Sequence, residues 1–459
     1  MTFRQLIGLT TLIGSTVLGC TATETDGQAA PEIDVPTVTA HEGMGSILVA
    51  KWTQNETKTT WLEFSVDEGE WLSSPPTERA AGPAQELVLG VPFGAEVQVK
   101  LVWEGGESEI VLEQTDALPD GAPRPTLVEG DPSAWDAASP YVLLCMQGEG
   151  EWGGEERAES LDGAWTFIID RQGRTVWAKA LDDFRMSLFT QLGYHGDSIL
   201  IDQSSFWTIF DGGDASRVER VNIEGEVLET WDTPGQHHPF TELPDGAIAW
   251  AAADAQFTNE ELKTLANDGT ERTLWSCQDF LDEEANGGEP GGYCGSNSLS
   301  YAPSTDTFLY SSFALETVIE IEADTGDTLR YFGHTGESAW TFDPPESTFW
   351  WQHGAHYTEA GNLLLSSKGE NAAHETVVIE YALDEQAQTL VEVLRLGEGA
   401  GLYGAAGGEA DYTAGGHILH NLGSRGVLRE YTPEGETVWS AEWDTDALGR
   451  STPLPSLYW

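Results

Sequence analysis

The sequence predicts an all-β protein, in which an N-terminal β-sandwich is followed by a six-bladed β-propeller. Three observations support this prediction. Residues 36–116 form short segments in which apolar and polar residues alternate, with turn residues between them. Residues 117–134 contain four prolines and no periodicity, which is typical of a linker. Residues 135–459 repeat one hairpin plan about every 50 residues, as the blades of a propeller do.

The chain begins with a predicted secretion signal. Residues 1–20 carry one basic residue and an apolar stretch that ends in Val17-Leu18-Gly19-Cys20. This run resembles a bacterial lipobox, in which the cysteine is lipidated and becomes the mature N-terminus. We therefore expect a lipoprotein of the cell envelope, anchored through Cys20 and tethered by residues 21–35; Thr21 favours the outer membrane, facing the periplasm or the exterior. An ordinary signal peptide with a chance cysteine is the alternative.

The composition is strongly acidic, with 77 acidic and 21 basic residues and a net charge of −56. Such a surface repels nucleic acid and anionic lipid, so neither is expected as a partner. We interpret the acidity as an adaptation for solubility. Calcium binding is the alternative, although the sequence has no D-x-[DN]-x-[DN]-G loop. No cofactor or metal site is predicted.

Three cysteines follow Cys20 in the chain. Cys277 and Cys294 bracket one glycine-rich loop and are expected to form a disulfide in an oxidising compartment. Cys145 lies in the apolar run YVLLCM and is predicted to be a buried small residue.

The predicted sandwich contains five segments with strand character: SILVAKWT, TTWLEFSV, ELVLGV, EVQVKLVWE and SEIVLEQT. Their number and length resemble a fibronectin type III module. Pairing of two subunits through this region, to form a homodimer, stays open.

The propeller prediction rests on a recurring hairpin with a turn glycine and a late aromatic residue. The first four turn glycines, at positions 173, 225, 269 and 326, stand 52, 44 and 57 residues apart. The next, Gly435, follows after 109 residues, which leaves room for two units, and EYALDEQAQTLVEVL fills the missing place without a glycine. This makes six units of four strands.

Histidines recur on the strands expected to line the central channel. These strands are 236–243, 296–302 and 351–358, and they carry His237, His238, His353 and His356. Convergent imidazoles at a channel mouth indicate a candidate active site. Polar residues that merely hydrate a channel are the alternative.

Four stretches resemble the bacterial aryl-sulfate sulfotransferase family: HHPFTELPDGAIA, SNSLSYAPSTDTFLYSS, WQHGAHYTEAGNLLL and LGSRGVLREYTPEGETVW. The resemblance extends over residues 135–459, and it implies a secreted sandwich-plus-propeller chain. It also implies transfer of a sulfuryl group from a phenolic sulfate ester to a phenol through a sulfated histidine, without a nucleotide donor.

Residue by residue, the resemblance implies that His353, which follows Gln352, is the nucleophile. It places His238, His237 and Asn297 among the substrate ligands.

Several positions depart from the family pattern. Gly295 stands where the family has a histidine and Phe313 where it has an arginine, Pro239 replaces an acid, and Thr376-Val377 replaces Ser-Arg. Sulfuryl transfer needs donors or cations for the sulfonate oxygens, so these departures favour an alternative: a non-catalytic propeller that binds a small aromatic ligand, a glycan or an envelope protein.

Other histidines could replace the missing imidazole or bind a metal. His195, His417 and His420 are predicted to be structural or surface residues. Since side chains alternate along a strand, His353 and His356 are expected to point to opposite faces, which disfavours a shared metal.

Overall fold

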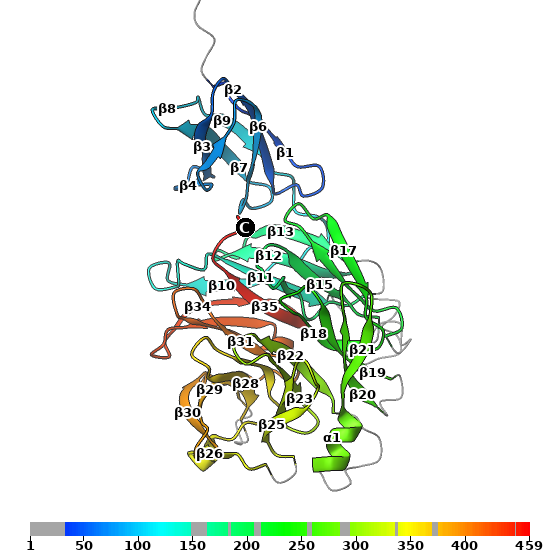
Figure 1. Cartoon of the computed structure of the whole chain (residues 1–459). Coiled ribbons are helices and arrows are strands. Elements are labelled where there is room, and N and C mark those ends of the chain that lie inside the picture. Colours follow the sequence, from blue (N-terminus) through cyan, green and yellow to red (C-terminus); the bar gives the residue numbers. More distant parts are fainter. Residues whose placement is uncertain are drawn as a thin grey trace, which may run out of the picture.

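The computed structural model describes residues 33–147, 163–181, 185–205, 213–254, 259–284, 294–335, 338–369, 375–445 and 447–459. Cys20, the expected signal segment and most of the expected tether lie outside them. Figure 1 shows a smaller N-terminal part joined to a larger part, both made almost entirely of strands. In the ranges given above, no helix is long and apolar enough to cross a membrane.

Two sheets form the smaller part. One has the strand order β1-β2-β6, and the other has the order β4-β3-β7-β8, with β5 paired to β3 and β9 to β7. Apolar residues from both sheets, such as Trp52 of β2 and Leu101 of β7, share one buried core. The strands are β1 (Thr37–Ala40), β2 (Leu48–Gln54), β3 (Lys58–Val66), β4 (Trp71–Ser73), β5 (Thr77–Arg79), β6 (Gly82–Val88), β7 (Glu96–Trp103), β8 (Gly106–Glu107) and β9 (Val111–Gln114).

The segment predicted to be a linker is partly a strand. β10 (Leu127–Gly130) pairs antiparallel with β34, so that Leu127 lies opposite Glu442. The sequence pattern did not predict this strand because of the prolines around it. Only four residues pair, and they lie at the edge of a sheet, where neighbouring prolines are tolerated.

The larger part contains six sheets of four or five strands. From the outer edge inward, their orders are β13-β12-β11-β35, β17-β16-β15-β14, β21-β20-β19-β18, β25-β24-β23-β22, β26-β30-β29-β28-β27 and β10-β34-β33-β32-β31. The strands of the first three sheets are β11 (Tyr141–Gln147), β12 (Ala164–Asp170), β13 (Thr175–Ala180), β14 (Gln191–Leu192), β15 (Ile199–Gln203), β16 (Arg217–Val221), β17 (Val227–Asp232), β18 (Gln236–Glu242), β19 (Ile248–Ala253), β20 (Glu260–Leu265) and β21 (Glu271–Ser276). The remaining strands are β22 (Ser296–Ala302), β23 (Thr307–Ser312), β24 (Thr317–Glu322), β25 (Thr328–Gly333), β26 (Thr341–Asp343), β27 (His353–Tyr357), β28 (Leu363–Lys368), β29 (Thr376–Asp384), β30 (Thr389–Leu396), β31 (Glu409–Tyr412), β32 (Ile418–Asn421), β33 (Val427–Tyr431), β34 (Thr437–Glu442) and β35 (Leu448–Leu454).

The repeated hairpins form the outer pairs of these sheets. All five predicted turn glycines have positive φ, for example 85° at Gly225 and 91° at Gly435. In the unit that lacks a glycine, Gln388 takes the left-handed position with φ 50°. The repeat predicted from the sequence is therefore present, and one unit forms its turn without glycine.

The innermost strands surround a common axis. Contacts link β18 to β22, β22 to β27, β27 to β31, β31 to β35 and β35 to β14. The last strand of the chain, β35, pairs with β11, the first strand of the first sheet, with Leu454 opposite Tyr141. The C-terminal strand thus closes the ring of sheets.

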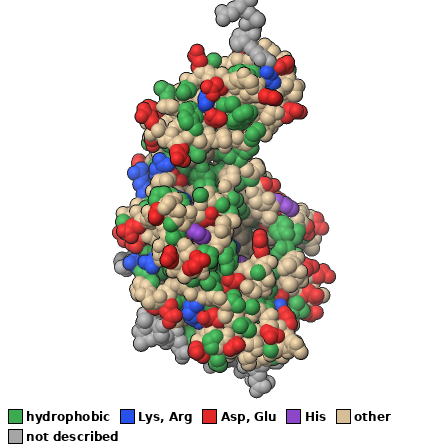
Figure 2. Space-filling view, turned by 90° about the vertical axis from the view of Figure 1, so that its left-hand side faces the viewer, with side chains coloured by type: hydrophobic (Ala, Val, Ile, Leu, Met, Phe, Trp, Pro, Cys, Tyr) green, Lys and Arg blue, Asp and Glu red, His purple; other side chains and the backbone are tan. Residues whose placement is uncertain are grey.

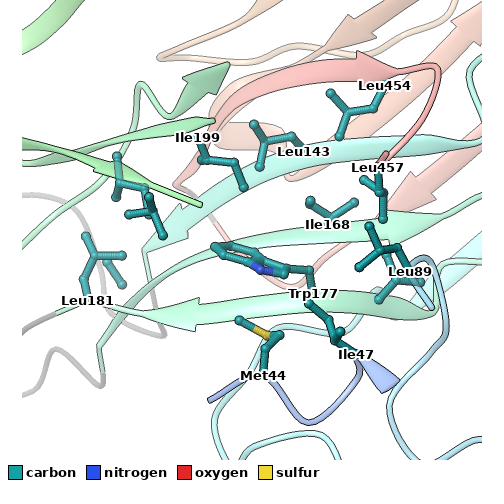
Figure 3. Packing of buried hydrophobic residues seen from close by; sticks show 14 residues of the cluster. Met44, Ile47, Leu89, Leu143, Ile168, Trp177, Leu181, Ile199, Leu454 and Leu457 are labelled. Atoms are coloured by element: carbon teal, nitrogen blue, oxygen red, sulfur yellow. The ribbon is translucent and has the colours of Figure 1, made fainter. Parts of the chain in front are cut away.

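A buried cluster joins the two parts of the molecule, as Figure 3 shows. Met44, Ile47 and Leu89 of the smaller part pack against Trp177 and Leu457 of the larger part. Hydrogen bonds cross the same junction, from Ser46 Oγ to the carbonyl of Val176 at 2.7 Å and from the Leu89 amide to the Tyr458 hydroxyl at 3.1 Å.

Among the residues that the structure describes, the helical elements are short: α1 (Cys277–Glu284), η2 (Pro345–Ser347) and η3 (Gly423–Arg425). Cys277 at the start of α1 is joined to Cys294 by a disulfide. Cys145 is a free, buried thiol on β11.

Candidate active site

A cavity of about 110 Å³ lies where the innermost strands begin. His238 of β18, Asn297 of β22 and His353 of β27 line it, together with Glu409 of β31 and Arg450 of β35. Its apolar wall consists of Leu188, Phe189, Ala406, Ala447 and Leu448. The cavity therefore combines an apolar surface that suits an aromatic ring with a few convergent polar groups.

Each predicted site residue lies at a β-bulge. The pairing of β18 with β19 shifts between Gln236 and Phe240, that of β22 with β23 between Ser296 and Ser298, and that of β27 with β28 between His353 and His356. A bulge adds a residue to one strand and turns its side chains away from the regular alternation. The three bulges account for the orientation of His238, Asn297 and His353 toward one cavity.

The bulge in β27 makes the strict alternation predicted for His353 and His356 wrong. They are three positions apart along β27, but their partners on β28, Ser366 and Leu364, are only two positions apart. The two imidazoles nevertheless have different surroundings: His356 Nε2 lies 3.4 Å from a carboxylate oxygen of Asp411, whereas His353 lines the cavity. No three His, Cys, Asp or Glu side chains among the described residues are grouped to hold a metal.

His353 is held as a neutral imidazole. Its Nδ1 lies 3.2 Å from the carbonyl oxygen of Trp351 and donates to it, which leaves the lone pair on Nε2. In the described part of the chain, Nε2 has no hydrogen-bond partner. Burial lowers the pKa of His353 to about 3, and the charge of Lys368 acts in the same direction. At neutral pH the ring is therefore uncharged, with Nε2 available.

His238 is also held neutral, since burial and the neighbouring His237 and His353 rings lower its pKa well below the usual value. Its ring meets the ring of Phe189 edge-on at 5.8 Å. His237 does not line the cavity. It contacts Nδ1 of His238 through its own Nδ1, and its Nε2 lies 3.2 Å from Glu260. His237 therefore supports His238 from behind.

Glu260 anchors this pair from β20 of the same sheet and is fully buried. Its carboxylate accepts from the amides of Gly295 at 2.6 Å and Ser296 at 2.9 Å, and from the Tyr310 hydroxyl at 2.5 Å. Burial acts to raise the pKa of Glu260, but the hydrogen bonds from His237, Ser296 and Tyr310 outweigh it and lower the pKa. A charged, fully hydrogen-bonded carboxylate thus fixes the backbone at position 295.

Asn297 and Gln352 connect β22 to β27. The Asn297 side-chain amide donates to the carbonyl of Gln352 at 2.5 Å, while Asn297 Oδ1 is buried and has no hydrogen-bond partner among the described residues. The Gln352 amide donates to Ser311 Oγ and to the carbonyls of Ser312 and Thr317, at 2.9 to 3.1 Å. Gln352 therefore positions the start of β27 and does not line the cavity.

Two cations near the cavity were missed by the sequence analysis. Figure 2 shows acidic side chains spread over both parts of the visible face, where basic ones are fewer. Inside, however, Arg450 lines the cavity, and its guanidinium is held by Gln191 Oε1 at 2.8 Å and by Glu409 at 3.4 Å. Lys368 lies behind Phe313, with Nζ 4.9 Å from the ring centroid. The signal for Lys368 was the sequence Ser366-Ser367-Lys368, which places a cation after paired serines one sheet later than expected.

The histidines predicted to be structural or surface residues lie away from the cavity. His195 packs on the ring of Tyr194, His417 pairs with Glu430 at 2.6 Å, and His420 is buried with Nε2 3.0 Å from Ser366 Oγ. These placements agree with structural roles.

The sequence profile of the arylsulfotransferase family (ASST) matches residues 154–448, which is more than half of the chain. The chain belongs to the arylsulfotransferase family. A comparison with curated proteins found no match.

Solved structures similar to this arylsulfotransferase-family chain share little sequence with it. A Bacteroides caccae protein of unknown function is 15% identical, with a TM-score of 0.45, and covers 69% of this chain and 100% of its own. The β-propeller domain of Myceliophthora thermophila Swd1 is 11% identical, with a TM-score of 0.41, and the match covers 72% of this chain and 88% of that domain. The periplasmic gluconolactonase of Pseudomonas aeruginosa is 14% identical, with a TM-score of 0.39 and coverage of 86% and 98%.

The positions that depart from the arylsulfotransferase pattern have structural roles here. Gly295 has φ 60° and donates its amide to Glu260, so a side chain at this position would be strained. Phe313 packs edge-on against His353, with ring centroids 5.5 Å apart. Thr376 Oγ1 accepts from the Gly404 amide at 2.9 Å, and Val377 is part of a hydrophobic core.

Proposed function

We propose that this arylsulfotransferase-family chain transfers a sulfuryl group from a phenolic sulfate ester to a phenol through a sulfated His353. One observation carries the proposal: a neutral imidazole with an available Nε2 lines the same cavity as the guanidinium of Arg450. Attack on sulfur needs the first, and the three sulfonate oxygens need the second.

In the first step, His353 Nε2 forms a bond to sulfur while the bond from sulfur to the aryl oxygen breaks. The electron pair leaves on the phenolate oxygen. The proton on Nδ1 stays hydrogen-bonded to the Trp351 carbonyl, which fixes the tautomer. Arg450 binds the sulfonate oxygens, and the apolar wall with Phe189 holds the aromatic ring.

In the second step, an acceptor phenol attacks the sulfonate, and the bond between sulfur and Nε2 breaks. The neutral His238 imidazole lies beside the cavity and accepts the phenol proton as a general base. His237 and Glu260, which lie behind His238, stabilise the imidazolium that forms. A buried carboxylate stabilises the imidazolium in a Ser-His-Asp triad in a similar way. Neither step needs a nucleotide, a metal or a redox partner.

We further propose the architecture and location in which this chemistry takes place. The six sheets around one axis are the blades of a propeller (135–459), and the two N-terminal sheets are a fibronectin type III-like sandwich (36–116). The chain is a lipoprotein anchored through Cys20, and it acts in the cell envelope at the outer membrane. Metabolic labelling with a fatty acid tests the anchor.

A second function is favoured by Gly295 and Phe313, which lack the imidazole and guanidinium of the family pattern. In that case the cavity binds a small aromatic ligand, a glycan or an envelope protein without turnover. The apolar cavity wall suits the first of these ligands.

Intact-mass analysis separates the two functions. The purified chain is incubated with 4-nitrophenyl sulfate and phenol, and we expect one added SO₃ group on the protein and release of nitrophenolate. His353→Asn should abolish both, whereas His356→Asn should retain them. The absence of an adduct and of release from pH 6 to 9 would contradict the transferase proposal.

A further inference from the structure

The proposed sulfation step at His353 requires positive charge, but this chain has Phe313 where the family pattern has an arginine. We propose that Lys368 is a positioning residue that supplies this charge from the neighbouring strand β28, acting on His353 and its sulfonate across the ring of Phe313. This inference rests on the proposed function and names the residue that tunes its nucleophile.

The contacts of Lys368 place its ammonium behind the cavity wall. Nζ lies 4.9 Å from the Phe313 ring centroid and 5.9 Å from that of Tyr403, and it donates to the carbonyl of Ala405. Phe313 in turn meets the His353 ring edge-on at 5.5 Å. The Phe313 ring thus contacts both the ammonium and the imidazole. The electrostatic interaction between Lys368 and His353 acts across this ring, where the dielectric constant is low.

The ammonium is buried without a carboxylate partner. The Lys368 residue is 4% exposed, and no ion pair joins it to an acidic residue in the described ranges. The charged groups that share its outer surroundings are Glu346, Glu392, Arg395 and Glu398, and of these Glu392 is already paired with Arg395 at 2.6 Å. A buried charge is costly unless it is compensated, and no carboxylate pairs with Lys368 in the described ranges, so an anion in the adjacent cavity would stabilise the ammonium. A sulfate ester in the adjacent cavity supplies that negative charge.

The titration of Lys368 gives the inference a measurable signature. Burial lowers the pKa of Lys368 to about 8, and the Lys368 charge in turn lowers the pKa of His353. Above pH 8 the ammonium loses its proton and its charge, so sulfation should slow as the pH rises through this value. Removal of the charge should raise the pKa of His353 toward the ordinary imidazole value.

The test measures nitrophenolate release from 4-nitrophenyl sulfate in the first turnover, as a function of pH. Lys368→Met should slow release by about 10- to 100-fold, which is a smaller effect than the removal of a donor in direct contact with the sulfonate. The variant should also lose the fall in rate near pH 8. Lys368→Arg should keep the rate and move this fall to higher pH. In the double variant Lys368→Met/Phe313→Arg, a cation returns to the family position, and the rate should recover in part. The matched control is Lys263→Met on β20. It removes an ammonium that pairs with Glu271 of β21, and it should behave as the wild type.

Two further measurements keep the inference separate from the proposed function. The pKa of His353, followed through its imidazole C–H resonances, should rise in Lys368→Met whether or not the enzyme turns over. If the wild type forms no sulfated species, the proposed function fails, and calorimetry with phenyl sulfate then decides the inference. Binding that weakens about 10-fold in Lys368→Met supports it, whereas unchanged binding, or an unchanged rate and pH profile in an active enzyme, overturns it.

Discussion

At the scale of single residues, the cavity keeps its imidazoles neutral by burying them. His353 and His238 both have lowered pKa values, and burial is the main cause for each. A neutral imidazole is what both proposed steps need, first as a nucleophile and then as a base. The site therefore obtains its reactivity from desolvation, and its positive charge comes from Arg450 and Lys368.

The lowered pKa of His353 predicts activity in mild acid. An ordinary imidazole is mostly protonated at pH 5, but a group with a pKa of about 3 stays neutral there. The rate of His353 sulfation should therefore be nearly constant from pH 5 to 7, as measured by first-turnover nitrophenolate release. A loss of rate centred near pH 6.5 would show that His353 is not desolvated in this way.

Arg450 is predicted to hold the sulfonate group of the substrate. Arg450→Met should lower kcat/KM for an aryl sulfate by about 10²- to 10³-fold, because the variant lacks a charged donor in the cavity. Arg272→Met, which removes a guanidinium that contacts the backbone carbonyl of Asp324 at 2.6 Å, is the control. An unchanged kcat/KM in Arg450→Met would exclude this role.

The sequence analysis identified the imidazoles but not the cations. His353, His238 and Asn297 lie on neighbouring innermost strands, whose order follows from the repeat, so their convergence on one cavity could be predicted. Arg450 comes from the last strand and Lys368 from a second strand, and each reaches the site only through the packing of sheets. The sequence around Arg450 and Lys368 does not indicate that they lie near His353.

At the scale of elements, the three bulged strands orient the site. Pro239 and Gly354 lie within two of the bulges, and both residue types are typical of such irregularities in strands. They were the signals against regular alternation, because an inserted residue shifts the phase of the side chains along the strand. His353 and His356 nevertheless have different surroundings, since only His353 lines the cavity.

Gly354 tests the importance of the bulge in β27. It has φ 65°, and a Cβ at this position would lie 2.3 Å from Cβ of Glu409. Gly354→Ala should destabilise the fold by about 1–3 kcal/mol and should displace His353, with loss of sulfation. Urea unfolding and the intact-mass assay measure the two effects.

Gly361, in the turn of the same hairpin, is the matched control. Its φ is 80°, but a Cβ there meets nothing within 4 Å. Gly361→Ala should cost about 1 kcal/mol and leave sulfation intact. Equal loss of activity in both variants would show that hairpin strain, and not the bulge, affects His353.

At the scale of the whole molecule, contacts between segments distant in sequence hold the ring together. The guanidinium of Arg171 pairs with Glu430 at 2.7 Å and packs on the ring of Trp439, and both charged residues are buried away from solvent. The sequence repeat predicted the strands and turns of the hairpins, but not this pair or strand β10, because both depend on which sheets become neighbours when the ring closes.

The Arg171–Glu430 pair predicts a large effect on stability. Glu430→Gln leaves a buried guanidinium without its counter-charge and should destabilise the protein by about 3–5 kcal/mol, measured by urea unfolding. The double variant Arg171→Met/Glu430→Gln should recover part of this loss. Glu271→Gln, at an exposed pair, should change stability by less than about 1 kcal/mol, and an equally small effect for Glu430→Gln would contradict the prediction.

The position of β35 has a consequence for biosynthesis. This strand is translated after the other strands of the ring, yet it pairs with the first of them and carries Arg450 into the cavity. A chain that stops before β35 therefore lacks both the closed ring and the proposed sulfonate ligand. If the proposed function is right, a nascent or clipped chain without β35 should be inert toward sulfate esters.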